Sequence, residues 1–128
     1  MWEGESCFII GGGYSLKDKD LSALSFYNTI GCNDAFKKYP WVDVVCFGDQ
    51  SWYKKNHKDL EDYHGLIVTN QVSLLHNTDK RIKVCRRLSF GIHTKDDWSL
   101  CWNNNTGGLA INLAVQLGAS KIYLLGYD

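Results

Sequence analysis

The chain alternates between short apolar runs and longer polar segments. Short apolar runs bounded by glycine, asparagine or aspartate are typical of buried β-strands rather than of helices. The run at 81–86 differs because polar and apolar residues alternate along it, which favours a half-exposed or edge strand. In all, the sequence predicts strands over residues 7–11, 27–32, 42–47, 65–70, 81–86 and 121–126.

The segments between these runs predict helices that differ in burial. Residues 109–117 are apolar around most of the helix circumference, so we expect this helix to be buried. Asn105 or Thr106 can cap its start, and Gly118 can end it. Shorter or more polar helices are predicted over residues 20–24, 33–38 and 50–60, whereas 71–80 and 87–105 are expected to be loops.

Strands and helices that alternate along a chain form a parallel sheet joined by right-handed crossovers. We therefore predict the α/β class: a Rossmann-like, open, mainly parallel sheet of five to six strands with helices on both faces. Residues 1–128 are enough for one domain with its own core. We expect this single Rossmann-like domain to bind a nucleotide, and the sequence is also compatible with a fragment of a longer chain.

Composition narrows the class of partner and the cellular setting. Lys plus Arg is 14 and Asp plus Glu is 14, which argues against broad nucleic-acid binding because such binding neutralises many phosphates. The five cysteines include no Cys-x-x-Cys pair, as expected for a reducing, cytoplasmic setting. The sequence predicts neither a signal peptide nor a membrane span. The many aromatic residues have three possible roles at this point: a stacking surface for a ligand, a subunit contact in a homo-oligomer, or an ordinary place in the core.

A glycine-rich turn follows the first predicted strand. Gly11, Gly12 and Gly13 remove side chains where the backbone of a doubly wound α/β protein approaches a phosphate, and Ser15 adds a hydroxyl. The turn is therefore a candidate floor for a nucleotide, and a tight turn without a ligand is the alternative. We do not expect a dinucleotide such as NAD, because Leu16 stands where the Gly-x-Gly-x-x-Gly fingerprint has its last glycine.

A pair of glycines lies at the start of the predicted buried helix. Thr106, Gly107 and Gly108 lie at its N-terminus, where free backbone N–H groups and the positive end of the helix dipole favour an anion. We expect a phosphate to reach these amides. The alternative is that both glycines only allow the helix to pack tightly against the sheet.

Amide and carboxylate side chains follow several predicted strands. In an open parallel sheet, ligands bind beyond the carboxyl ends of the strands, and Asn33, Asp34 and Asp49 stand there. Asn33 and Asp34 are candidate nucleotide contacts, and Asp34 lies about where a ribose-binding acid would be. Asp49 is a candidate base, metal ligand or ribose contact, and the alternative is that it only caps the helix that follows. The four histidines share no metal-ligand spacing, so no metal site is predicted from them.

Two stretches together resemble a known group of proteins. They are residues 9–16, which contain the glycine turn, and residues 105–128, which contain Gly107, Gly108 and the last predicted strand. The chain is similar to the Rossmann-like superfamily that holds the bacterial sialyltransferases using CMP-sialic acid, the DUF115 or MptE-like proteins and short phage-borne relatives. The resemblance implies a cytoplasmic protein of a bacterium or its phage, with a nucleotide or nucleotide-sugar as its ligand.

The resemblance also implies roles for individual residues. The glycine turn would contact the nucleotide, and Asn33 matches an asparagine that contacts the cytidine nucleotide in the sialyltransferases. Thr106, Gly107 and Gly108 match a segment that lines the same pocket. The sialyltransferase turn has Asn-Gly-Pro-Ser, whereas this chain has Gly-Gly-Tyr-Ser. The catalytic histidine of that family lies beyond the last predicted strand, in a part that this sequence does not contain.

Three functions are open at this point. The first is a glycosyltransferase-like domain that binds a nucleotide or nucleotide-sugar, in which the helix N-terminus would stabilise the departing phosphate and Asp49 would be the base. The second is a non-catalytic, phage-type accessory or morphogenetic protein that keeps the crevice. The third is a pterin diphosphokinase-like transferase, which needs Mg²⁺ and would bring Asp34, Asp49 and Asp128 together on the ion.

Overall fold

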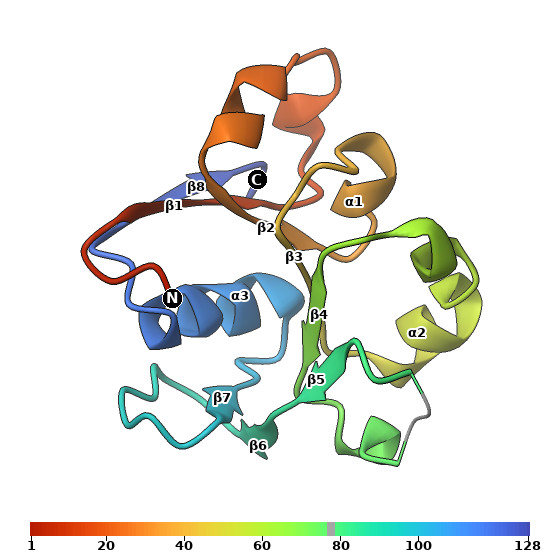
Figure 1. The fold of residues 1–128 in the computed structure, drawn as a ribbon, viewed down its shortest axis with the longest axis vertical. Coiled ribbons are helices and arrows are strands. Elements are labelled where there is room, and N and C mark those ends of the chain that lie inside the picture. Colours follow the sequence, from red (N-terminus) through yellow and green to blue (C-terminus); the bar gives the residue numbers. More distant parts are fainter. Residues whose placement is uncertain (77–78) are drawn as a thin grey trace.

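The computed structural model describes residues 1–76 and 79–128, in which six parallel strands form one open sheet flanked by helices (Figure 1). The strand order is β5-β4-β3-β2-β1-β8, and each neighbouring pair is parallel. The predicted α/β class is therefore confirmed. The strands are β1 (Ser6–Ile10), β2 (Asn28–Cys32), β3 (Val44–Phe47), β4 (Leu66–Thr69), β5 (Ile82–Val84) and β8 (Lys121–Leu125).

Helices cover both faces of this sheet (Figure 1). α1 (Ala35–Lys38) and α2 (Gln50–Asn56) lie on one face, and α3 (Thr106–Gln116) lies on the other. The chain moves along the sheet from β1 to β5 and then returns to add β8 beside β1, so the direction of winding reverses between β1 and β8. Ligands of doubly wound sheets bind at such a reversal, beyond the carboxyl ends of the strands. Short 3-10 helices occupy Tyr14–Leu16, Ser22–Phe26, Asp59–Asp62 and Val72–Leu74.

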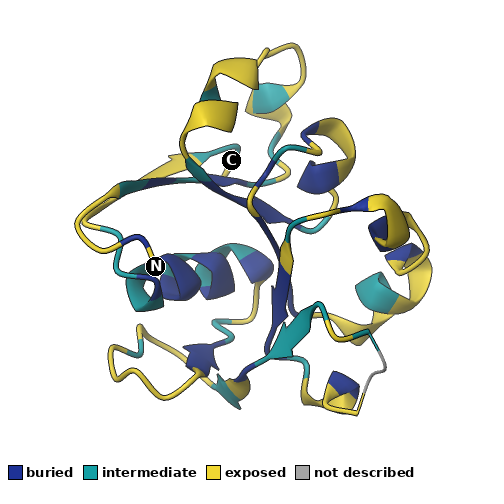
Figure 2. Ribbon diagram, in the orientation of Figure 1, coloured by how far each residue is buried: buried dark blue, intermediate teal, exposed yellow. Residues whose placement is uncertain are grey.

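Two apolar cores lie on the two faces of the sheet (Figure 2). All of β3 is buried, because a strand in the middle of a parallel sheet is covered on both faces. Its alternate side chains enter different cores: Val44 and Cys46 pack with α3, whereas Val45 and Phe47 pack with α1 and α2. β8 is different, since it forms an edge of the sheet and its residues are only half-buried or exposed.

The element boundaries follow the predicted pattern with small differences. The strand predicted at 42–47 begins at Val44 because the N–H of Val42 donates to the carbonyl of Tyr39 in a turn. The helix predicted at 50–60 divides into α2 and a 3-10 helix, and the one predicted at 20–24 is also of the 3-10 type. No helix in the part of the chain that the structure describes is long and apolar enough to cross a membrane. The loop predicted at 71–80 contains residues 77–78, which lie outside the described residues.

The prediction of a loop over residues 87–105 is confirmed for 89–98 and 102–105 but missed two short strands. β6 (Arg86–Leu88) and β7 (Ser99–Cys101) pair in a second, two-stranded parallel sheet inside this segment. Each strand has only three residues. An alternating pattern needs a longer run before it can be distinguished from irregular structure.

The strand predicted at 81–86 is divided between the two sheets. The N–H of Cys85 donates to the carbonyl of Thr69 at 2.8 Å and so continues the pairing of β5 with β4. The N–H of Arg86 instead donates to the carbonyl of Trp98 at 2.8 Å, beside the second sheet. The chain therefore changes sheets within one residue, which no local pattern indicates.

Asn112 of α3 ties the small sheet, and the loop between its two strands, to the helix that packs on the large sheet. Its side chain is fully buried, and its Oδ1 accepts hydrogen bonds from the N–H groups of His93 (2.9 Å) and Cys101 (3.0 Å). Its Nδ2 donates to the carbonyl of His93 at 2.9 Å. A buried amide that pairs with three backbone groups accounts for a polar residue in an otherwise apolar helix.

We predict that Asn112→Ala lowers the free energy of unfolding by about 2–4 kcal/mol, because the buried N–H of Cys101 and the half-buried N–H of His93 lose their acceptor. Urea denaturation followed by circular dichroism measures the change. Gln50→Ala, at an exposed position of α2, is the control and should change the free energy by less than about 0.5 kcal/mol. A loss below about 1 kcal/mol in Asn112→Ala would show that the amide does not hold the small sheet in place.

Candidate functional site

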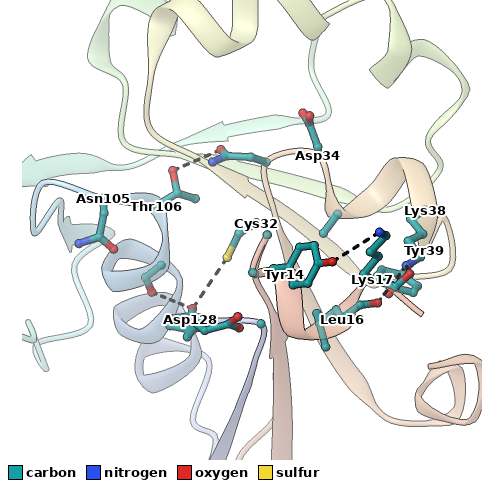
Figure 3. A pocket seen from close by; sticks show the side chains of 18 of the residues that line it. Tyr14, Leu16, Lys17, Cys32, Asp34, Lys38, Tyr39, Asn105, Thr106 and Asp128 are labelled. Atoms are coloured by element: carbon teal, nitrogen blue, oxygen red, sulfur yellow. Dashed lines mark hydrogen bonds between the residues drawn. The ribbon is translucent and has the colours of Figure 1, made fainter. Parts of the chain in front are cut away.

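A cleft of about 840 Å³ opens where the direction of winding reverses (Figure 3). It lies beyond the carboxyl ends of β1, β2 and β8 and beside the N-terminus of α3. Both glycine-bearing segments singled out from the sequence border it. The candidate nucleotide contacts that line the cleft are Gly11, Gly12, Gly13, Asn33, Asp34, Thr106 and Gly107, whereas Ser15, Gly108 and Asp49 do not line it.

The three glycines of the first turn have different roles. The N–H of Gly13 donates to the carbonyl of Gly126 at 2.7 Å, and a Cβ on Gly13 would lie 2.5 Å from the same oxygen. The N–H of Gly11 likewise donates to the carbonyl of Leu125 at 2.7 Å. Gly12 is different: a Cβ there would meet nothing within 4 Å, and no residue in the described ranges accepts from its N–H. None of the three has a positive φ, so close approach of two backbones explains Gly11 and Gly13, and Gly12 faces open space.

Ser15 holds the glycine turn to the end of β8. Its N–H donates to Asp128 Oδ2 at 3.0 Å, and its hydroxyl donates to Oδ1. These two hydrogen bonds hold the pKa of Asp128 below its ordinary value of 3.8. A lowered pKa means that the ionised carboxylate stabilises the fold above that ordinary value, and that this contribution is lost as the pH falls through the folded pKa. At neutral pH, Ser15 is therefore hydrogen-bonded to an ionised Asp128.

The start of α3 offers two free backbone donors. Asn105 is the N-cap residue, and its Oδ1 accepts from the N–H of Gly108 at 2.6 Å. Capping by Asn105, one of the two predicted possibilities, is thus confirmed, and it removes the Gly108 amide from the set that a ligand could use. The N–H groups of Thr106 and Gly107 have no acceptor among the residues that the structure describes. They lie at the positive end of an 11-residue helix.

Tyr127 fills the space between the glycine turn and α3, a packing role that the sequence does not indicate. A Cβ on Gly11 would lie 3.2 Å from Tyr127 Cδ1, and a Cβ on Gly107 would lie 2.9 Å from Cε2. The Tyr127 hydroxyl donates to the carbonyl of Gly107 at 3.0 Å and lies 3.9 Å from Cys32 Sγ. Burial raises the pKa of Tyr127 well above its ordinary value. Gly107 is therefore required for packing, and its carbonyl is already used by Tyr127.

Asn33 and Thr106 connect the end of β2 to α3 across the cleft. The Thr106 hydroxyl donates to Asn33 Oδ1 at 3.2 Å. Asn33 has a φ of 51°, a left-handed backbone conformation that asparagine tolerates better than most residues. Its Nδ2 has no acceptor within the described part of the chain. Asn33 therefore presents an unused donor to the cleft.

The two acids proposed from the sequence occupy different environments. Asp34 lines the cleft, where its Oδ1 accepts from Trp52 Nε1 at 2.7 Å and lies 3.7 Å from Lys37 Nζ. Asp49 is exposed and stands at the N-cap position of α2, although its side chain makes no capping bond. Within residues 1–76 and 79–128, no group of three His, Cys, Asp or Glu residues could hold a metal ion. Asp34, Asp49 and Asp128 therefore do not converge as the diphosphokinase alternative requires.

The end of the cleft farthest from Thr106 is basic and aromatic (Figure 3). Tyr14, Lys17, Lys38 and Tyr39 line it. Lys38 Nζ donates to the carbonyl of Lys17 at 3.0 Å and lies 5.4 Å from the centre of the Tyr39 ring. Lys17 Nζ lies 5.3 Å from the centre of the Tyr14 ring. The sequence analysis missed these residues, because surface lysines are common and nothing in their spacing distinguishes this pair.

Cys32 lies in the wall of the cleft with 6% of its surface exposed. Burial raises the pKa of its thiol to about 11, and the hydrogen bond with Tyr127 lowers the pKa by less. Because the thiolate is the nucleophile, Cys32 is not activated for covalent chemistry at neutral pH.

We predict that iodoacetamide at pH 8 modifies Cys32 in the native protein on the order of 100-fold more slowly than in urea, since a thiol in the unfolded chain has an ordinary pKa of about 8.5. Peptide mass spectrometry after timed quenching measures the rate at Cys32 itself. The native rate should rise as the pH approaches 10, because the thiolate fraction rises. Equal rates in the native and the unfolded protein would mean that the thiol is neither buried nor held in its protonated form.

No protein-family model, curated protein or solved structure matches this chain. A ligand is therefore assigned from the cleft itself: from its free backbone amides, its basic end and its hydrogen-bonded carboxylates.

Proposed function

We propose that this chain binds a nucleotide or nucleotide-sugar through a phosphate at the cleft. The observation that carries this proposal is the convergence of unused backbone donors: the N–H groups of Gly12, Thr106 and Gly107 border one cleft and have no acceptor among the residues described. Two of these donors lie at a helix N-terminus, where an anion is stabilised by the helix dipole. The third belongs to the glycine whose Cβ position is open.

The size and the lining of the cleft suit a nucleotide. Ligand pockets are typically about 300–1,000 Å³ and combine apolar or aromatic walls with a few polar groups, and this cleft has a volume of about 840 Å³. Tyr14 offers an exposed ring at its rim, on which a base or a sugar can stack. Asn33 adds the unused amide donor. The resemblance to nucleotide-sugar transferases supports the same ligand class.

Transfer of the sugar would use the same contacts. As the bond between sugar and phosphate breaks, the negative charge that develops on the phosphate would be stabilised by the N-terminus of α3. A base for the acceptor is harder to assign. Asp49 does not line the cleft, and both carboxylates that do, Asp34 and Asp128, already accept hydrogen bonds from neighbouring side chains.

These engaged carboxylates favour a second candidate function, in which the chain binds the nucleotide without transferring a sugar. Hydrolysis of a nucleotide-sugar, followed by chromatography, separates the two. If the chain is a transferase with Asp49 as its base, Asp49→Asn abolishes turnover and leaves binding unchanged. If it only binds, neither the wild type nor Asp49→Asn releases the nucleotide.

The proposal predicts that Gly12→Val weakens nucleotide binding about tenfold or more, equivalent to at least about 1.4 kcal/mol, without lowering the melting temperature. The valine side chain points into open space and so clashes only with a ligand. Isothermal titration calorimetry against CMP, UMP, CDP, UDP, GDP and ATP, with thermal melting of the free variants, measures both quantities.

Gly13→Ala is the matched control in the same turn. Its Cβ would press on the carbonyl of Gly126, so this variant should lose about 1–3 kcal/mol of stability through overpacking. If none of these nucleotides binds the wild type at millimolar concentration, the proposed function is wrong. If they bind and Gly12→Val binds equally well, the phosphate does not lie on the glycine turn.

A further inference from the structure

The basic end of the cleft, formed by Lys17, Lys38 and Tyr39, is not used by the phosphate contacts proposed above. In Figure 3 these three residues lie at one side of the cleft and Thr106 lies at the other, with Cys32 between them. A phosphate on the amides of α3 therefore leaves this end free for another part of the same ligand.

The two lysines have no acidic partner within residues 1–76 and 79–128. No Asp or Glu in the described residues forms an ion pair with Lys17 or Lys38, whereas the neighbouring Lys37 pairs with Asp34 and Asp59. Two acids line the cleft: Asp34 is held by Lys37 and Trp52, and Asp128 accepts hydrogen bonds from Ser15. Two cations without carboxylates at one end of a cleft attract an anion.

Lys38 is held in position and keeps one donor. Its ammonium donates to the carbonyls of Leu16 (3.1 Å) and Lys17 (3.0 Å), which fastens α1 to the 3-10 helix after the glycine turn. An ammonium has three N–H groups, so one is left for a ligand. Lys17 is exposed, and among the described residues its ammonium makes one polar contact, a long one of 3.5 Å to the Tyr14 hydroxyl.

Tyr39 supplies an independent observation at the same place. Only 6% of its surface is exposed, its side chain lines the cleft, and its hydroxyl has no hydrogen-bond partner in the part of the chain described. A buried hydroxyl without a partner costs stability, and natural structures seldom keep one without a reason. The hydroxyl oxygen is itself buried in the free protein, so an oxyanion beside Lys38 would accept from it after the surrounding side chains move aside.

We propose that the ligand carries a second anionic group, and that Lys17, Lys38 and the Tyr39 hydroxyl bind it at the end of the cleft opposite α3. This inference rests on the proposed nucleotide site. The group is either a second phosphate, as in a nucleoside diphosphate or its sugar, or a carboxylate on the sugar. Both are oxyanions that an ammonium and a hydroxyl recognise in the same way.

Matched ligand pairs identify the source of the charge. If the second anion is a phosphate, UDP binds the wild type about tenfold more tightly than UMP, as one additional charge-assisted contact would give, and UDP-glucose and UDP-glucuronate bind alike. If it is a sugar carboxylate, UMP and UDP bind alike and UDP-glucuronate binds more tightly than UDP-glucose. Calorimetry measures all four dissociation constants.

Variants locate the contact. Lys17→Gln should weaken the binding of whichever ligand of a pair the wild type prefers, and should leave the affinity for the other ligand unchanged. The control is Lys19→Gln, because Lys19 is exposed in the same segment but lies outside the cleft. This variant should change neither affinity. Tyr39→Phe should weaken the preferred ligand severalfold without lowering the melting temperature of the free protein, because its hydroxyl has no partner there.

The outcomes separate this inference from the proposed function. If no nucleotide binds, both are wrong. If UMP binds but the wild type prefers neither member of either ligand pair, the proposed nucleotide site is supported and the proposed second anionic group is wrong. If a preference exists and Lys17→Gln or Tyr39→Phe leaves it unchanged, the basic end is not where the second anion is bound.

Discussion

The close contact between the first and the last strand of the large sheet determines where the cleft lies. The glycine turn after β1 donates through Gly11 and Gly13 to the carbonyls that end β8, and this is possible only because neither glycine has a side chain. The contact places Tyr127 against the start of α3. Gly12 is left between these fixed points, where it lines the cleft and its N–H has no acceptor among the described residues. A turn that looks uniform in the sequence thus combines two packing glycines with one that faces solvent.

The main architecture could be predicted from the sequence because its signals are local. Short apolar runs that alternate with polar or helical segments specify strands in a parallel sheet, and all six predicted strands of that sheet were found. The small sheet was missed because each of its strands has three residues and its position depends on distant partners. Asn112 is the example: its polar side chain gives no sign of its purpose until the loop around His93 is placed beside α3.

The candidate site could be located but not described in detail. Small, amide and acidic residues at the carboxyl ends of strands and at the start of α3 indicated one edge of the sheet, and seven of those residues line one cleft. The sequence could not show that Gly108 would be taken by the Asn105 cap or that Ser15 would bind Asp128. Nor could it show Tyr127 and the lysine pair, because their importance comes from contacts between segments far apart in the chain.

The pairing of β8 with β1 has a consequence for how the protein is made. On the ribosome, β1 emerges before the other strands of the large sheet and its neighbour β8 emerges after them. A nascent chain that has not yet reached residues 121–125 therefore leaves β1 as an open sheet edge. Contacts of such wide sequence separation form late and slowly. Until β8 arrives, the unpaired backbone groups of an apolar strand are available to other chains. The same chain closure that builds the cleft covers β1 and leaves β8 as the edge of the sheet, so the pairing of β1 and readiness for a ligand are gained in one step.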